Sequence, residues 1–264
     1  MPCKDRPRHA PAEGTQKSNF YAYSGNRIQV SMNYRELFEA TKRFREDPIA
    51  YDTAWVEARK IDWQNLHDLP VEKMMKEVIG SKKLFKKSGF LNRWKCRLPC
   101  SIELANHIKN TFRQLTPFLR VLEGETLEDI VFDKTKSVGD EKLKNREIIR
   151  HIFDKTSDMG KNGYMPVPAS KLLHMVNPKL FVMWDKNIGK RYVPKLDGHH
   201  YAYVFLPQMQ REVNEAIDAY VKDTNLNRNA AIKQMESHCG RTLAKLVDEC
   251  NYIKYTRPLQ TRQI

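Results

Sequence analysis

The chain has 264 residues, enough for one large domain or two small ones with a hydrophobic core. Its 46 Lys and Arg outnumber 32 Asp and Glu and leave a formal net charge of +14, which favours polyanionic partners such as nucleic acid. Aromatic residues make up 10% of the chain and argue against global disorder, while only 11 Gly and 13 Pro argue against turn-rich sandwiches and barrels.

The N-terminal residues and the cysteines bear on where the protein works. Residues 1–19 lack the apolar core of a secretory signal peptide, and the chain nowhere has the roughly 18 consecutive apolar residues of a membrane span. The cysteines show no regular spacing, which favours reduced thiols: Cys3, Cys96, Cys100, Cys239 and Cys250. We therefore expect a cytoplasmic protein without membrane contact, associated with the nucleoid if it binds DNA.

Helical patterns fill most of the chain after a polar start. Residues 1–30 have no helical period, and we expect them to form a disordered basic arm. A helix then begins near Asn33, because Asn33 and Glu36 form a capping-box pattern, and it stops at Pro48. Further helices are predicted over the ranges 50–66, 70–80, 101–122, 126–132, 140–156, 201–224 and 229–255.

The fold class follows from these patterns. Alternating apolar and polar stretches are nearly absent, so we expect at most two short strands. The sequence predicts a mainly α protein of about nine to eleven helices, in a single multi-helix globular domain over residues 31–256. We expect residues 257–264 to form a flexible C-terminal tail.

Basic and aromatic residues are interleaved in residues 80–97, "GSKKLFKKSGFLNRWKCR". Seven cations occur there without an acid: Lys82, Lys83, Lys86, Lys87, Arg93, Lys95 and Arg97. Cations neutralise phosphates while aromatic rings stack on bases, so this composition is typical of sites for single-stranded or distorted nucleic acid. The alternative is an amphipathic element with its lysines in water, and the helical spacing of Leu91 and Trp94 favours the core for those two side chains.

A second candidate lies in residues 166–192, "PVPASKLLHMVNPKLFVMWDKNIGKRY". Lys171 follows a short hinge of small residues, and Asp185 comes after the apolar run Leu180–Trp184, at the start of another helix. An aspartate at a helix start caps exposed amides, and a nearby lysine favours its charged form. The same two groups can also act as a nucleophile and its electrostatic partner. The pattern leaves both interpretations open, a helix cap with a surface lysine or a catalytic pair.

The stretch "MPVPASKLLHMVNPKLFVMWDKNI" resembles the signature of the helix-hairpin-helix DNA glycosylases. In that family a glycine-containing hairpin leads to a helix with a catalytic lysine, and a loop then supplies a catalytic aspartate. Matched by position, residues 165–169 are the hairpin, Lys171 is the lysine and Asp185 is the aspartate, although residues 167–169 include no glycine. The stretches "FLNRW" and "GRTLAKLVDECNYIKYT" also resemble parts of an uncharacterised prokaryotic or phage protein family, which implies no activity.

The glycosylase resemblance implies a fold and a reaction. The fold is all-helical, and the DNA partner binds a basic surface that includes residues 82–97 and the cations after Asp185: Lys186, Lys190 and Arg191. A modified or damaged base is extruded into a helical cleft. Lys171 then attacks the sugar C1′, Asp185 stabilises the oxocarbenium charge, and a Schiff base allows strand cleavage.

Other chemistry has little support in the sequence. His174 lies three residues after Lys171 on nearly the same helix face, where it is placed to shuttle protons; a hydrogen-bonded histidine at the edge of the core is the alternative. Cys96-x3-Cys100 and the distant His238-Cys239 pair do not form a metal-binding set. Phosphate-loop, dinucleotide and serine-hydrolase motifs are absent. We predict no metal site and no cofactor.

Three functions remain open on sequence alone. The first is a DNA-binding protein of the helix-hairpin-helix glycosylase type that excises a base. The second is a nucleic-acid-binding module without catalysis, which needs only a continuous basic face. The third is a helical interaction protein with an acidic protein partner, which needs an exposed apolar patch.

Overall fold

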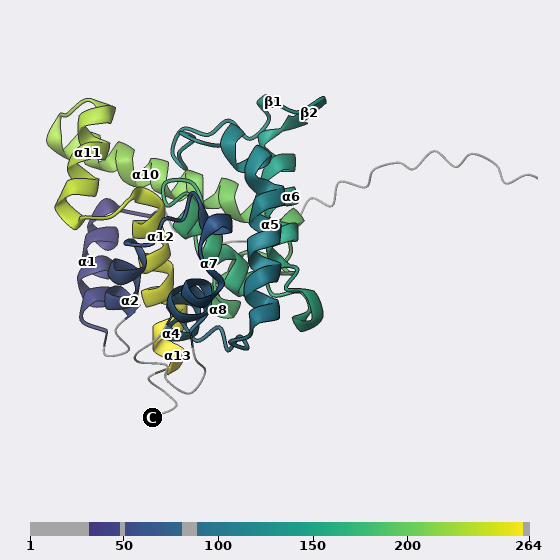
Figure 1. The fold of residues 1–264 in the computed structure, drawn as a ribbon. Helices are drawn as coiled ribbons and strands as arrows, with labels where there is room; N and C mark the ends of the chain where they lie inside the picture. The colour runs from purple at the N-terminus through teal and green to yellow at the C-terminus, as the bar shows by residue number, and fades with distance from the viewer. Residues whose placement is uncertain (1–31, 48–50, 81–88, 261–264) are drawn as a thin grey trace, which may run out of the picture. The chain divides into compact units, whose positions relative to one another are not determined.

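The computed structural model describes residues 32–47, 51–80 and 89–260. Within these ranges the chain is mainly helical, as predicted (Figure 1). Helical segments that follow one another without a break make eleven helices there, and a two-stranded antiparallel hairpin is the one sheet. The predicted N-terminal arm, Lys82 to Lys87 and residues 261–264 lie outside the described ranges.

The element order is as follows. The helices are α1 (Tyr34–Arg45), α2 (Tyr51–Ala58), α3 (Val71–Lys73), α4 (Phe90–Arg93), α5 (Ile102–Val121), α6 (Asn145–Ser157), α7 (Pro166–Val176), α8 (Lys186–Tyr192), α9 (Gly198–His200), α10 (Leu206–Thr224), α11 (Arg228–Cys239), α12 (Leu243–Asn251) and α13 (Arg257–Gln260). π-Helical turns extend or join them at Met74–Ile79, Tyr201–Phe205 and Tyr252–Thr256, and 3-10 turns lie at Leu66–Asp68 and Gly160–Asn162. The strands are β1 (Thr135–Val138) and β2 (Glu141–Lys144).

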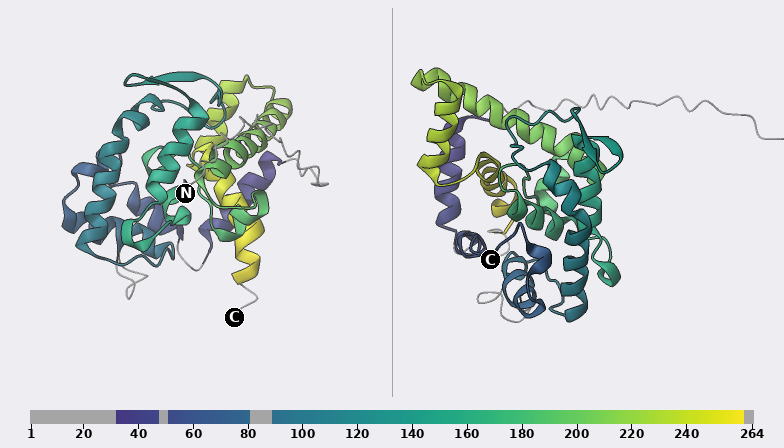
Figure 2. Two further views of the ribbon diagram at one scale, coloured as in Figure 1. Left: turned by 90° about the vertical axis from the view of Figure 1, so that its right-hand side faces the viewer. Right: turned by 45° about the horizontal axis from the view of Figure 1, so that its top comes forward.

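Two groups of helices pack around the core. The helices α5 and α6 run side by side, and α6 also packs on α7 (Figure 1). The helix α12 packs between α1, α10 and α11, and the two further views show the yellow C-terminal helices beside the purple α1 (Figure 2). None of the helices in the described ranges combines the length and the apolar character needed to cross a membrane.

Several predicted boundaries differ from the observed ones. The helix expected over residues 229–255 is broken at Gly240, whose left-handed φ of 58° ends α11 before α12 begins, and the helix expected over residues 50–66 ends at Ala58.

Residues 141–144 form a strand rather than the first turn of a helix, because Gly139 adopts a left-handed φ of 58° and turns the chain back on β1. Residues 126–132 form turns instead of a helix, although Ile130 N–H does bond to Thr126 O. At the other end, α13 continues the helix over residues 257–260, where we expected a tail.

The connection between α6 and α7 positions the candidate site. Residues 158–165 turn the chain tightly, with Gly160 and Gly163 at φ of 60° and 78° and a β-bridge between Asp158 and Tyr164. The hairpin that the resemblance places at residues 165–169 is instead the N-cap and first turn of α7, since a proline at the first helical position is already shaped for a helix. The result is a helix, a glycine-containing turn and a second helix, with the turn several residues earlier than the sequence pattern places it.

The apolar run Leu180–Trp184 is fully buried. It is an extended segment whose backbone is held by side chains: Tyr201 donates its hydroxyl proton to Val182 O at 2.7 Å, and Trp184 N–H lies 3.2 Å from Ser170 Oγ. Because this run is anchored in the core, the position of the next residue, Asp185, is fixed. Asp185 caps the N-terminus of α8.

The loop after α4 is held by one buried side chain. The Asn92 side chain donates to Gly80 O (2.6 Å) and Leu98 O (2.9 Å) and accepts from Leu98 N–H (2.7 Å). Between these anchors, Lys95 and Arg97 both adopt a φ of 58°, which is unfavourable for residues with a side chain. The two left-handed residues turn their side chains to solvent and the intervening Cys96 inward.

We expect Asn92→Ala to lower the free energy of unfolding by about 3 kcal/mol, because it removes three hydrogen bonds from buried groups. Urea unfolding followed by circular dichroism measures this change. The control is Asn106→Ala, an exposed position of α5, which should stay within about 0.5 kcal/mol of the wild type. Equal effects of the two substitutions would show that Asn92 does not hold the loop.

Candidate functional site

A cavity of about 540 Å³ opens where several distant segments meet. Its walls come from residues 94–97, from the start of α7 with Lys171, from residues 183–188, and from the C-terminal helices between Asp248 and Thr256. Five of the side chains that the sequence analysis selects are among the lining residues: Lys95, Arg97, Lys171, Asp185 and Lys186. The size is typical of small-molecule sites, which range from about 300 to 1,000 Å³.

Lys171 is buried in the wall of this cavity rather than exposed on the surface. Its side chain is 6% exposed, and Nζ donates to Trp94 O at 2.8 Å. Nζ also lies 3.5 Å from the Cys96 sulfur and 5.4 Å from the centre of the Trp94 ring. Burial raises the pKa of the Cys96 thiol, although the Lys171 ammonium opposes the shift. The alternative of a solvated surface lysine is therefore wrong.

Asp185 is held by three donors in the cavity wall. Its Oδ1 accepts from the backbone N–H groups of Asn187 (2.8 Å) and Ile188 (2.9 Å), and Thr256 Oγ1 donates to Oδ2 at 2.5 Å. The residue is thus the N-cap of α8 and a lining residue of the cavity at once. No direct ion pair joins it to Lys171 within the described part of the chain, so a ligand between them would meet both groups separately.

Aromatic side chains make up much of the remaining wall. Phe44, Tyr51, Trp94, Trp184 and Tyr252 all line the cavity. The Trp94 ring is in contact with the Tyr51 ring, with 5.4 Å between the ring centroids. Flat π surfaces beside cationic groups are suited to a planar, heteroaromatic ligand.

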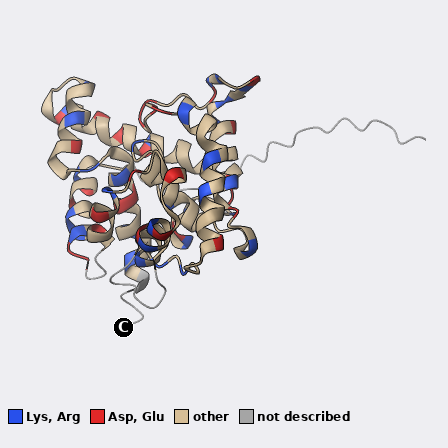
Figure 3. Cartoon of the chain, viewed as in Figure 1, with Lys and Arg blue, Asp and Glu red and all other residues tan. Residues whose placement is uncertain are grey.

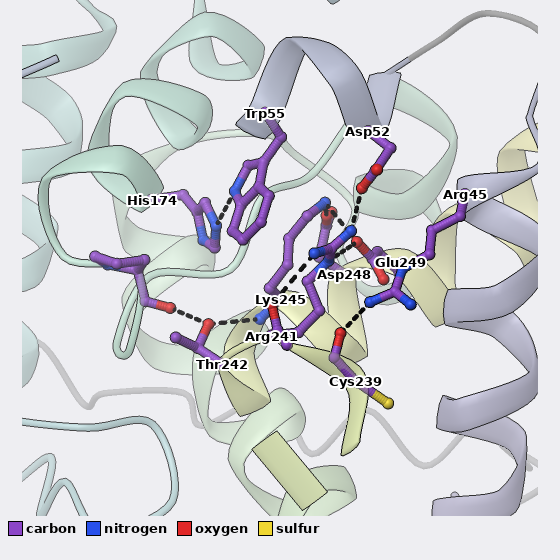
Figure 4. Close-up of polar contacts among 12 residues, drawn as sticks. Arg45, Asp52, Trp55, His174, Cys239, Arg241, Thr242, Lys245, Asp248 and Glu249 are labelled. Carbon is purple, nitrogen blue, oxygen red and sulfur yellow. Dashed lines mark hydrogen bonds and ion pairs between the residues drawn. The ribbon is translucent and has the colours of Figure 1, made fainter. Parts of the chain in front are cut away.

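A buried ion network under the cavity was missed in the sequence (Figure 4). The fully buried Lys245 binds Asp248 (2.7 Å) and lies 3.5 Å from Glu249, while Arg241 bonds to Glu249 (2.9 Å) and to Asp52. All nine residues of α12 are buried, so its charged side chains have to find partners inside the protein. The spacing of the charges in "GRTLAKLVDEC" was a usable signal, since an apolar helix with a cation and two acids three and four residues on is unusual for a surface helix.

Asp248 is the member of this network that lines the cavity. Burial raises its pKa to about 6, although the Lys245 ammonium opposes the shift. Asp248 is therefore a carboxylate at neutral pH. The cavity thus holds two carboxylates, those of Asp185 and Asp248, of which only Asp185 was predicted.

His174 does not join the cavity residues. It is fully buried one turn further along α7, outside the cavity lining, where Nδ1–H donates to Phe181 O at 2.7 Å and Nε2 accepts from Trp55 Nε1–H at 3.4 Å. Burial lowers its pKa to about 3, with a further contribution from the positive charge of Lys245. The imidazole stays neutral at physiological pH, so the structure gives it the packing role and not that of a proton shuttle near neutral pH.

The predicted nucleic-acid contacts fall into three groups. Lys82, Lys83, Lys86 and Lys87 lie outside the described residues. Arg93 is engaged in an ion pair with Glu57, whereas Lys95, Arg97 and Lys186 are exposed at the cavity. Lys190 and Arg191 are exposed in the last turn of α8. Figure 3 shows Lys and Arg spread over several helices in this view, interspersed with acidic residues, rather than gathered on one.

The described residues include no group of three or more His, Cys, Asp or Glu side chains placed to hold a metal ion. Comparison with protein-family models, with curated proteins and with solved structures finds no match for this chain.

The buried neutral His174 should make stability depend on pH. Its pKa is about 6.5 in the unfolded chain and about 3 in the fold, so the folded state binds fewer protons below pH 6.5. The free energy of unfolding should therefore fall on acidification, by about 1.4 kcal/mol per pH unit at most from this group. We expect His174→Asn, whose amide can still donate to Phe181 O, to remove this component.

The measurement is urea unfolding of wild type and variant between pH 4.5 and 8. Below pH 6, protonation of Asp248 changes the free energy of unfolding with pH in the opposite direction. This contribution is present in both proteins, so it cancels in the difference between them. The control lies in the same data, since the two curves should run parallel above pH 7. Parallel curves down to pH 4.5 would mean that His174 is protonated in the folded state.

Proposed function

We propose that this protein binds DNA and excises a base in the cavity, with Lys171 as the nucleophile and Asp185 as the stabilising carboxylate. The observation that carries the proposal is that both residues line one aromatic cavity, although fourteen positions of chain and a buried apolar run separate them. A cap and an unrelated surface lysine would have no reason to share a pocket. The substrate class is a modified or damaged base, as the sequence resemblance implies.

The aromatic lining supports the entry of a base. A base that leaves the DNA stack loses its stacking contacts, and rings in a protein pocket replace them. The rings of Trp94 and Tyr51 are available in the cavity wall, beside the exposed cations Lys95 and Arg97. These cations are placed to contact the phosphates that flank the extruded nucleotide.

The positions of the two reactive groups support the chemistry. As a neutral amine, Lys171 Nζ attacks C1′, and the base leaves with the electrons of the broken C1′–N bond and takes up the proton that the amine loses. Asp185 stabilises the positive charge that develops on the sugar ring. Opening of the sugar then gives a Schiff base with Lys171. The Asp185 carboxylate does not need to move, because three donors already fix its orientation.

The turn between α6 and α7 also supports a helix-hairpin-helix interpretation. The glycines that the family's hairpin requires are absent from residues 165–169, but Gly160 and Gly163 occupy left-handed positions just before α7. Lys161 is exposed between them. The turn leads directly into the cavity wall at Tyr164 and Met165.

An interaction protein without nucleic acid has less support. Four large apolar side chains are exposed in the described ranges, Val56, Ile102, Val131 and Tyr164, and each belongs to a different helix, turn or loop. A docking patch of several hundred Å² would need neighbouring apolar residues.

The central test is borohydride trapping on duplexes with abasic sites and modified bases. Wild type should form a covalent adduct, and Lys171→Gln should form none, because the reduced Schiff base needs the Lys171 amine. The variant should still bind the abasic duplex, within about threefold of the wild type. The matched control is Lys233→Gln, an exposed lysine of α11 far from the cavity lining, which should trap normally.

The other outcomes discriminate among the three functions. An adduct that persists in Lys171→Gln would place the nucleophile elsewhere. Binding with steep salt dependence but no adduct would favour the non-catalytic nucleic-acid module. If no duplex binds at low salt, both nucleic-acid functions fail and an acidic protein partner becomes the better account.

The salt dependence of binding tests the phosphate contacts. The slope of log affinity against log salt should become shallower by about 0.9 for each of Lys95→Gln, Arg97→Gln and Lys186→Gln, if each cation neutralises one phosphate. The change should be the same on duplexes of different sequence. Fluorescence anisotropy between 50 and 200 mM salt, roughly the range in which such slopes are measured, gives the values. Lys233→Gln should leave the slope unchanged, and a slope that is equally unchanged in the three cavity variants would remove them from the interface.

A further inference from the structure

Asp248 has an unused hydrogen-bond acceptor at the cavity. The residue is 4% exposed, and Lys245 Nζ donates to its Oδ2 at 2.7 Å. In the described part of the protein no donor reaches Oδ1, whereas both oxygens of the neighbouring Asp185 are bonded. An ionised carboxylate can accept at both oxygens, so Oδ1 is free to accept a further donor. A ligand in the cavity can supply the missing donor.

The buried ion network does not by itself require Asp248 to face a cavity. Glu249 also neutralises Lys245, from the same helix and at 3.5 Å, and Glu249 lies outside the cavity lining. The two acids thus share one cation, but only Asp248 can reach a bound molecule. Three other charged residues of the cavity lining are exposed cations, Lys95, Arg97 and Lys186, which are donors for carbonyl oxygens.

We infer that Asp248 selects the base: its Oδ1 accepts a hydrogen bond from a ring N–H of a base that carries a carbonyl group next to that N–H. This inference rests on the proposed function, because it takes the ligand to be an extruded base. The chemical class is the oxo-base with a lactam edge, such as hypoxanthine, guanine, uracil and their oxidised derivatives. A lactam N–H is a more acidic donor than an exocyclic amine, so it makes the stronger bond to a carboxylate. The adjacent carbonyl oxygen meets the cationic side of the cavity.

Asp248→Asn is a specific test, because the substitution replaces only the acceptor at Oδ1 and keeps an oxygen toward Lys245. The Lys245 ammonium can only donate, so the amide must keep its oxygen toward Lys245 and place its NH2 group where Oδ1 was. An acceptor at the cavity becomes a donor, while the volume and the contact to Lys245 are kept. If Asp248 accepts a hydrogen bond from the ring N–H, the variant should lose the preference for bases that carry this N–H.

The probes are two duplexes that each carry one unpaired base in a single-nucleotide bulge, with 2′-fluorination to prevent excision. One base is hypoxanthine and the other is 1-methylhypoxanthine, which lacks the ring N–H. Wild type should bind the hypoxanthine duplex about tenfold more tightly, the size expected for one hydrogen bond to a charged group. Asp248→Asn should bind the two duplexes equally or prefer the methylated base.

The control variant is Glu249→Gln, which changes the same ion network away from the cavity and should keep the tenfold preference. Loss of the preference in Glu249→Gln as well would mean that the network, and not Asp248, is responsible. Equal binding of both bulges by wild type would overturn the inference without any variant, even if Asp248→Asn does not fold. If wild type binds neither bulge better than an unmodified duplex, base entry itself fails, and the proposed function fails with it.

Discussion

The buried ammonium group of Lys245 sets the arrangement around the cavity. It lies inside the core, where an unpaired cation would cost several kcal/mol or more, so its surroundings have to compensate for lost water. Asp248 and Glu249 do so from α12 itself. Three rings from other segments face the same ammonium: Phe44, Trp55 and Trp94, at 4.4, 5.8 and 4.9 Å from ring centre to Nζ. These contacts fix α1, α2 and the loop after α4 against α12.

Trp94 contacts both the buried Lys245 and the candidate nucleophile, Lys171. Its ring lies near Lys245 and also 5.4 Å from Lys171 Nζ, and its backbone oxygen accepts the Lys171 hydrogen bond. The next residues, Lys95 and Arg97, are held in a backbone conformation that costs roughly 1–2 kcal/mol each. The Asn92 bonds and the Lys171 bond offset that cost. Strain of this kind is tolerated where the surroundings fix the chain, and it is common at functional sites.

The fold class could be predicted because helix periodicity is a local property. The apolar faces of α1 and α5 are visible in the sequence as residues three and four apart, and both helices occur where they were expected. The strand β2 was assigned to a helix because "EKLK" suits both states, and only the turn at Gly139 decides between them. The glycine turn before α7 lies outside residues 165–169, where the resemblance places the hairpin.

Part of the site could be predicted for the same reason, and part could not. Lys171 and Asp185 belong to one short stretch with a recognisable order, so their proximity was accessible from sequence. The charges of α12 were accessible only in part: their place in an apolar helix is a signal, but a lysine and an aspartate three residues apart more often form an exposed pair on a helix surface. The buried network also includes Arg241, which precedes α12 and pairs with Glu249. Arg241 has a second partner in Asp52, which lies 189 positions away along the chain. No local pattern reports a contact over that distance.

The wide spread of the cavity lining along the chain affects how the protein folds. The lining residues run from Phe44 to Thr256, and the C-terminal helices provide the floor. Contacts between such distant segments carry a large loop-closure entropy and form late in folding. During synthesis, a ribosome would therefore release most of the helical scaffold before the cavity exists. The site can therefore be completed only after α12 has been made and has packed against α1.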